Sequence, residues 1–169
     1  MLETALSIEP VWPDEIDWEA LAQRAATAAL ERTAHGDWLT RSVMIEVSIR
    51  LTTDAEVQTL NAQYRQKDKP TNVLSFPMVQ ADLLDGIANT DDSEVLLGDI
   101  ALAHGVCARE AAEKGISVED HATHLIVHGT LHLLGYDHAD DAEANAMEVI
   151  EIDALKSLGL SDPYLIVED

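Results

Sequence analysis

The sequence predicts an α+β fold in which about four strands pack with about five helices. Segments with the period of an amphipathic helix outnumber segments that alternate with the period of a strand. The two kinds do not alternate strictly along the chain, which favours the α+β class. A length of 169 residues suits one well-buried domain and is short for two. We therefore expect residues 1–169 to form a single domain.

The first half of the chain is predicted to contain two strands and two helices, each recognised from the spacing of its apolar residues. In chain order they are a short edge strand at residues 6–8, an amphipathic helix over 14–34, a half-buried strand over 42–51 and a helix from about 54 to 64. Thr53 is expected to be the N-cap of the second helix, because its hydroxyl can accept from a free backbone N–H.

The second half is predicted to contain two strands and three helices. They are strands at 72–76 and 96–103, and helices over about 105–114, from about 118 to the end of a histidine-rich stretch, and over 140–158. Pro77 is expected to stop the first of these strands, and Gly115 the first of these helices. Ser117, followed by Glu119 and Asp120, has the pattern that starts a helix.

Composition limits the kinds of protein that this chain can be. It contains no run of eighteen apolar residues that would span a bilayer, and its first residues lack the basic and apolar segments of a secretory signal. The single cysteine, Cys107, cannot form an intramolecular disulfide and is expected to pack on a helix as a small apolar residue. Because this usage suits a reducing cytosol, we expect a cytoplasmic protein with no membrane partner.

Charge is the most unusual property of the sequence. The formal net charge is −22, and because phosphate backbones favour basic surfaces, strong nonspecific binding of nucleic acid is not expected. Three of the ten basic residues, Arg65, Lys67 and Lys69, nevertheless fall within five positions. Alone they suggest a solvated loop, but beside a metal site they could bind phosphate groups.

The stretch from residue 80 to residue 94 carries five acidic residues and no basic one. This composition predicts a mobile acidic surface loop. We expect an insertion without a chemical role, and a lid over the site is the alternative.

Three histidines near the C-terminal end, His128, His132 and His138, have a spacing that can build a metal site. His128 and His132 are four residues apart, so on a helix they can converge on one zinc ion at about 2.0–2.1 Å. Gly135 is the natural helix stop, after which the chain can return His138 as the third ligand. The predicted zinc site therefore lies on the central helix and the following turn, although imidazoles also suit nickel, copper or iron. Three protein ligands leave the fourth position for water, which is typical of catalytic zinc, so we interpret the chain as a metal-dependent hydrolase.

Other histidine arrangements lead to different hypotheses. His124 lies four residues before His128, so this pair is a rival ligand face. The spacing of the three predicted ligands also matches H-E-x-x-H-x-x-G-x-x-H of the metzincin peptidases, in which the glutamate is the general base. Here that position is Gly129, which has no side chain to accept a proton. The substitution counts against peptide hydrolysis by that mechanism.

Four separated motifs resemble, in the same order, those of one known family. The string from His128 to His138 resembles the signature H-G-x-L-H-L-x-G-Y-D-H, and residues 64–77 resemble the block Y-R-x-K-D-x-P-T-N-V-L-S-F-P. Residues 97–100 look like its L-G-D-I strand, and residues 159–164 resemble its C-terminal G-x-x-D-P-Y. The family that these motifs resemble is the YbeY family of bacterial endoribonucleases, which act in ribosomal RNA maturation.

The resemblance implies an α+β fold with a small mixed β-sheet covered by helices, one zinc ion bound by the three histidines, and cleavage of single-stranded RNA. It also implies a role in maturation of small-subunit ribosomal RNA and in late ribosome quality control. Ribosomal RNA and the small ribosomal subunit are then the expected partners, with a ribosomal protein or another ribonuclease left open, and DNA is not expected. The resemblance assigns the functional arginine to Arg65. Ser75 also matches a motif position, where we favour a strand hydroxyl bonded to backbone.

Metal-assisted hydrolysis of a phosphodiester is the mechanism that these residues favour. Zinc can lower the pKa of bound water to about 7, so the missing glutamate is tolerable. The Arg65 guanidinium can bind two phosphate oxygens and stabilise developing charge, which a lysine would match poorly. Lys67 and Lys69 are expected to bind flanking phosphates. Asp137 is expected either to orient a ligand histidine or to shape the turn.

Two other classes of protein stay open at this point. In the first, the chain is a metal-binding, ribosome-associated factor without nuclease activity of its own. Its metal would be structural and would be closed by a fourth protein ligand. In the second, the chain is a metalloprotease-like hydrolase of peptides or small molecules, which the histidine spacing and the acidic surface favour.

Overall fold

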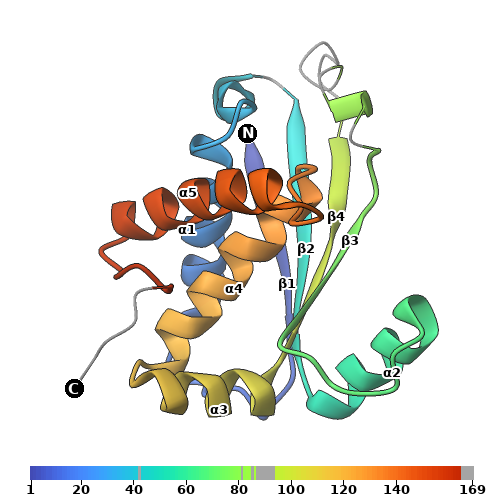
Figure 1. Cartoon of the computed structure of the whole chain (residues 1–169), viewed down its shortest axis with the longest axis vertical. Helices are drawn as coiled ribbons and strands as arrows, with labels where there is room; N and C mark the ends of the chain where they lie inside the picture. Colours follow the sequence, from blue (N-terminus) through green and yellow to red (C-terminus); the bar gives the residue numbers. More distant parts are fainter. Residues whose placement is uncertain (42, 81, 85, 87–93, 165–169) are drawn as a thin grey trace.

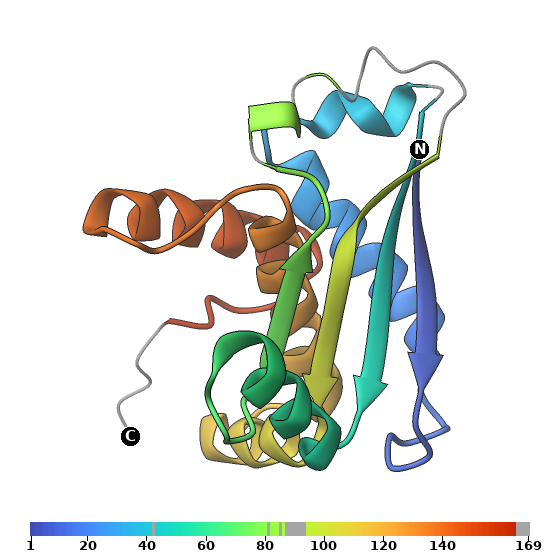
Figure 2. The same cartoon turned by 90° about the vertical axis from the view of Figure 1, so that its right-hand side faces the viewer.

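A computed structural model of the chain describes residues 1–41, 43–80, 82–84, 86 and 94–164. Within these residues four strands form one mixed sheet in the order β1-β2-β4-β3 (Figure 2). The strands are β1 (Leu2–Ile8), β2 (Met44–Thr52), β3 (Val73–Pro77) and β4 (Glu94–Ala103). The first two and β4 run parallel, whereas β3 pairs antiparallel with β4 and forms an edge.

Helices lie on both sides of this sheet. In the described part of the chain they are α1 (Trp18–Glu31), the short 3-10 helix η1 (Gly36–Thr40), α2 (Asp54–Arg65), α3 (His104–Lys114), α4 (Val118–Leu133) and α5 (Asp141–Ser157). Figure 1 shows α1, α4 and α5 on one side of the sheet and α2 on the other. The predicted α+β class, with a small mixed sheet and five α-helices, is confirmed.

The apolar residues form two clusters, one on each side of the sheet. The larger cluster joins the inward side chains of β2 to α1 and α4, and it includes Ile45, Val47, Ile49 and Leu51, all fully buried. This is the alternation predicted for the strand. The smaller cluster lies under α2 and α3 and contains Val57, Leu74, Ala101, Ala103 and Val106. Because α4 lies on the larger cluster, the core fixes the helix that carries the histidines.

Capping side chains set the starts of α2 and α4 as the sequence indicated. Thr53 accepts from the backbone N–H of Glu56 at 3.2 Å, and Ser117 accepts from that of Asp120 at 3.1 Å. The first helix is shorter than predicted and begins at Trp18, because the Asp17 side chain caps it. A cap satisfies backbone donors that the helix leaves free and so fixes the first turn.

Several predicted boundaries were wrong. The first strand covers Leu2–Ile8 rather than residues 6–8, and the 3-10 helix Gly36–Thr40 was not predicted. The α-amino group of Met1 donates to the carbonyl oxygens of Trp38 and Val43 at 2.7 and 2.8 Å, which anchors this edge strand. Pro77 was predicted to stop the strand after residue 76, but it is the last residue of β3, which an edge strand tolerates.

The predicted mobile acidic loop, residues 80–94, is only partly described. Residues 82–84 form one 3-10 turn with Leu84 buried in the larger cluster, and Glu94 begins β4. Residues 81, 85 and 87–93 lie outside the described residues. Among the helices that are described, none combines the length and the apolar character needed to cross a membrane.

Candidate metal centre

The helix α4 places His128 and His132 one turn apart on the same face. Their ring centroids are 4.6 Å apart, and their Nε2 atoms are 3.0 Å apart. Two nitrogens bound to one tetrahedral zinc at the usual distance are separated by about 3.3 Å. The two imidazoles are therefore spaced almost as a shared metal ion requires.

A turn after α4 brings His138 back to the same place. The helix ends at Leu133, and Gly135 has a φ of 91°, a left-handed conformation that glycine adopts without steric cost. The ring of His138 lies 6.2 Å from that of His128 and 5.3 Å from that of His132, centroid to centroid. One ligand nitrogen from each of the three residues lies within 4.8 Å of the others. The structure thus brings together the three predicted ligands.

The outer nitrogens of the two helical histidines show how these side chains fit a metal. Nδ1 of His128 is 2.9 Å from a carboxylate oxygen of Glu151, and Nδ1 of His132 is 2.9 Å from the carbonyl oxygen of Tyr136. Both oxygens accept, so each Nδ1 donates its hydrogen. In the neutral rings both Nε2 atoms then carry lone pairs that face each other across 3.0 Å. A cation between them would remove the repulsion, which fits the donor set of an imidazole metal site.

The rival pair, His124 and His128, also comes together, through a residue that the sequence prediction missed. His124, His128 and Glu151 form a second group that could hold a metal. Glu151 is fully buried on α5, and its Oε2 accepts from Nε2 of His124 at 2.7 Å as well as from His128. Burial would raise the pKa of Glu151, but the two hydrogen bonds outweigh this effect and lower the pKa to about 2. The sequence did contain a signal for Glu151: it is a charged residue four positions after Met147, on the apolar and buried face of the helix.

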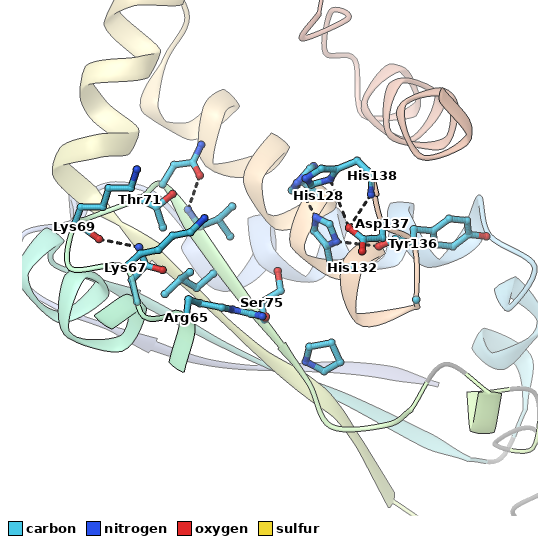
Figure 3. Close-up of a pocket in the computed structure, with 16 residues that line it drawn as sticks. Arg65, Lys67, Lys69, Thr71, Ser75, His128, His132, Tyr136, Asp137 and His138 are labelled. Atoms are coloured by element: carbon cyan, nitrogen blue, oxygen red, sulfur yellow. Dashed lines mark hydrogen bonds and ion pairs between the residues drawn. The ribbon is translucent and has the colours of Figure 1, made fainter. Parts of the chain in front are cut away.

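The three histidines line one side of a groove of about 810 Å³, and the predicted basic residues line it as well. Figure 3 shows Arg65, Lys67 and Lys69 across from the histidines, with Ser75 between the two groups. Arg65 is the last residue of α2, so it enters the groove over the edge strand β3. The structure therefore places all the predicted site residues around one groove.

Arg65 is held in place by two contacts on β3. One of its terminal nitrogens donates to the carbonyl oxygen of Ser75 at 2.6 Å, and its guanidinium lies 5.3 Å from the centre of the Phe76 ring. A guanidinium has five N–H donors, so this bond leaves others for a ligand. Ser75 itself lines the groove and takes part in this contact through its carbonyl group.

The loop that carries the two lysines is shaped by a buried amide. Asn61 is only 3% exposed, and its side chain donates to the carbonyl oxygen of Lys69 at 2.9 Å, while its own carbonyl accepts from the N–H of Lys67 at 3.2 Å. Gln66, which follows the last residue of α2 and precedes Lys67, adopts the left-handed conformation, with a φ of 56°. These contacts turn the chain directly after α2 and keep both lysines at the groove.

Two further residues of the histidine motif have positions that bear on the hypotheses. Asp137 accepts from the backbone N–H of His138 at 2.7 Å, whereas its carboxylate lies 3.9 Å from Nδ1 of that ring, beyond hydrogen-bond range. This favours the interpretation that Asp137 shapes the turn. At Gly129, a Cβ atom would lie 3.1 Å from two side-chain carbons of Ile100 on β4. A side chain at position 129 would therefore point into the sheet.

The fold and the site together define a class of protein, an α+β protein in which three histidines that could hold a metal ion share a groove with basic side chains. The family model described as Endoribonuclease YbeY matches residues 11–159. The chain belongs to this family of endoribonucleases, and the enzyme class predicted from the sequence is confirmed.

Proteins from several bacteria support the same membership. The chain is 65% identical over 169 residues to "Endoribonuclease YbeY" of Rhizorhabdus wittichii, with 100% of both chains covered. It is 56% identical over 164 residues to the protein of that name in Sphingopyxis alaskensis, covering 97% of this chain and 98% of the relative. A solution structure of the protein TM1509 from Thermotoga maritima, 22% identical, matches with a TM-score of 0.54 over 98% of this chain and 100% of that chain. This last similarity concerns the fold alone.

Proposed function

We propose that this protein is a zinc-dependent endoribonuclease that cleaves single-stranded RNA during maturation of small-subunit ribosomal RNA and in late ribosome quality control. The name shared by the relatives supports RNA as the substrate. The observation that carries the proposal is that the three histidines and Arg65, Lys67 and Lys69 line the same groove. Ribosomal RNA and the small subunit are the proposed partners.

The three histidines would hold one zinc ion through the nitrogens that lie within 4.8 Å of one another. When bound, zinc supplies Lewis acidity toward a phosphoryl oxygen and allows water to act as a nucleophile near neutral pH. Arg65 offers a planar pair of N–H donors in the same groove, which suits two oxygens of the phosphate under attack. Its charge would stabilise the negative charge that develops there.

Lys67 and Lys69 extend the basic side of the groove along the loop after α2. Both side chains are exposed and would bind phosphates that flank the scissile one. The rest of the molecule is strongly acidic, with a net charge of −22 over the whole chain. An RNA strand would therefore be attracted to this groove and repelled by most of the remaining surface.

The two alternative classes fit these observations less well. A peptidase of the metzincin type needs a glutamate after the first histidine, and here Gly129 packs against Ile100. A structural metal would be closed by a fourth protein ligand. Among the described residues, the candidate group around His138 consists of the three histidines alone. This supports a site of the catalytic type.

The test combines metal analysis with cleavage of single-stranded RNA, duplex RNA and a peptide. We expect wild type to bind one zinc ion and to cleave single-stranded RNA, including RNA that spans an immature end of small-subunit ribosomal RNA. Arg65→Ala should lower the cleavage rate by about 10²–10³ with unchanged zinc content, and Arg65→Lys should restore little. His132→Ala should lose both zinc and cleavage.

Arg24→Ala is the matched control, because Arg24 is exposed on α1 and does not line the groove. It should cleave like wild type. Full activity of Arg65→Ala, or loss of zinc in that variant, would contradict the assignment of Arg65. Cleavage of the peptide in place of RNA would favour the metalloprotease-like alternative.

A further inference from the structure

A hydrogen-bond network around a buried carboxylate lies behind the metal-binding group, on the side away from the groove. It centres on Glu151 of α5, whose side chain is 0% exposed. In Figure 1 α5 crosses next to α4, and the chain after α5 turns back beneath it. The network therefore links α4, α5 and the C-terminal segment that carries the last of the motifs found in the sequence.

Both carboxylate oxygens of Glu151 have partners. Oε2 accepts from Nε2 of His124 at 2.7 Å and from Nδ1 of His128 at 2.9 Å, and Oε1 accepts from the hydroxyl of Tyr164 at 2.6 Å. A buried carboxylate needs such donors, because without them its desolvation would be strongly unfavourable. The three donors therefore hold the carboxylate in one orientation.

The bond to Glu151 decides which nitrogen of His128 faces the predicted metal. An ionised carboxylate only accepts, so Nδ1 of His128 must carry the hydrogen. Nε2 is then unprotonated in the neutral ring, and it is this atom that lies 3.0 Å from Nε2 of His132. Histidines that bind metals commonly donate their other ring N–H to a carboxylate in this manner, which fixes the tautomer and the orientation of the ring.

The C-terminal segment brings Tyr164 to this carboxylate. After α5, Gly159 adopts a φ of 81°, and the N–H of Leu160 donates to the carbonyl oxygen of Leu155 at 2.9 Å, which reverses the chain. Asp162 then accepts from the backbone N–H of Tyr164 at 2.8 Å. The segment from 159 to 164, which matched a motif without an assigned role, thus ends on the network behind the metal-binding group.

We propose that Glu151 is a positioning residue for the metal centre, which holds His128 with Nε2 directed at the metal, and that Tyr164 fixes Glu151 in turn. The inference rests on the metal site of the proposed function and deepens it. The alternative is that Glu151 is a ligand of a second metal with His124 and His128. The carboxylate oxygen already lies within hydrogen-bond distance of both nitrogens, at 2.7 and 2.9 Å, so hydrogens account for these contacts without a cation.

The test measures the tautomer of His128 and the affinity for zinc, neither of which depends on RNA cleavage. Nitrogen-15 NMR of the histidine rings reports the tautomer in the metal-free protein, and competition with a chelator gives the zinc dissociation constant. In wild type we expect His128 to carry its hydrogen on Nδ1 and one zinc ion to bind per chain. Glu151→Gln offers an amide N–H that can donate to Nδ1, so part of the His128 population should move its hydrogen to Nε2.

Zinc affinity should then fall by about 10–100-fold in Glu151→Gln, as it does when such outer carboxylates are lost elsewhere. Tyr164→Phe keeps the carboxylate and should show a smaller loss in the same direction, and it provides the comparison if Glu151→Gln does not fold. Asp153→Asn is the matched control, because it removes a charge from an exposed position on the same helix. It should bind zinc like wild type.

Three results would overturn the inference. In the first, His128 of the wild type carries its hydrogen on Nε2. In the second, Glu151→Gln binds zinc as tightly as wild type. In the third, wild type binds a second zinc ion that Glu151→Gln does not bind. Failure of the proposed function would look different. Wild type would then bind zinc with the predicted dependence on Glu151 but leave RNA intact.

Discussion

Replacing Gly98 with alanine should destabilise the protein and weaken the metal site. Gly98 lies in β4, where it pairs with Pro77 of β3 and is close to Leu133 at the end of α4. An added Cβ atom would lie 2.5 Å from the carbonyl oxygen of Phe76 and 2.6 Å from a methyl carbon of Leu133. Both distances are far inside van der Waals contact. The first involves backbone within the sheet, so relief requires movement of a strand or of the helix end.

The magnitude follows from two opposing effects. Forcing an extra methyl group into a packed core costs about 1–3 kcal/mol, whereas alanine restricts the unfolded chain and returns about 0.4–1 kcal/mol. Because one of the atoms that the Cβ would meet is backbone, the cost should lie in the upper half of that range, about 2–3 kcal/mol. The net loss in the free energy of unfolding should then be about 1–2.6 kcal/mol, a fall in Tm of about 2–10 °C for a protein of this size. Leu133 is next to His132, so movement of the helix end should also raise the zinc dissociation constant.

Thermal unfolding of the metal-free protein, followed by circular dichroism, measures the effect. The double variant with Leu133→Ala is the control, because it removes the methyl carbon that the new Cβ would meet. The two changes should therefore cost less together than the sum of the single variants, by about 0.5 kcal/mol or more. A Tm of Gly98→Ala equal to that of wild type, or strictly additive costs, would refute the reasoning.

Three further predictions concern metal, acid and salt. Zinc at about 100 times its dissociation constant should add about 2.7 kcal/mol to the free energy of unfolding, which is a rise in Tm of about 5–11 °C. A chelator should reverse this rise, and His132→Ala should not show it; an equal rise in that variant would count against the site. Burial lowers the pKa of His121, although its bond to Glu110 opposes this shift. The stability that the neutral ring contributes is therefore present above about pH 6.5, the ordinary pKa of histidine, and is lost as the pH falls toward the folded-state pKa. The metal-free protein should thus lose Tm between pH 7 and 5, and His121→Gln should lose less over that range; an unchanged slope would reject the idea. Removing Lys67 or Lys69 should weaken RNA binding and reduce the slope of log K against log salt concentration by about 0.7 per lysine. Lys156 is exposed on α5, so Lys156→Ala should leave that slope unchanged. Equal slopes in the three lysine variants would contradict phosphate contacts by Lys67 and Lys69.

Features that depend on neighbours in sequence were predicted well. The alternation of β2 and the caps Thr53 and Ser117 act over two to four residues, and the structure has them where the sequence placed them. The histidine spacing belongs to the same kind, because the pitch of α4 and the turn at Gly135 bring the three rings together. Local geometry was sufficient for these elements.

Features that depend on distant partners were missed. The first four residues of β1 become a strand because they pair with β2, more than forty positions away, and because the α-amino group of Met1 is anchored near η1. In the sequence, Glu151 only interrupts an apolar stripe. Its role depends on its partners on α4, which lie 23 and 27 positions earlier in the chain. No local pattern specifies such contacts, since they depend on how the helices pack.

The most direct test of the metal centre is a crystal structure of the zinc-loaded protein with anomalous scattering recorded at the zinc edge. We expect one zinc ion at about 2.0–2.1 Å from Nε2 of His128, from Nε2 of His132 and from a ring nitrogen of His138, with solvent as the fourth ligand. Imidazole rings that point away from a common centre, or a fourth protein side chain that closes the coordination shell, would contradict a catalytic zinc site in this protein.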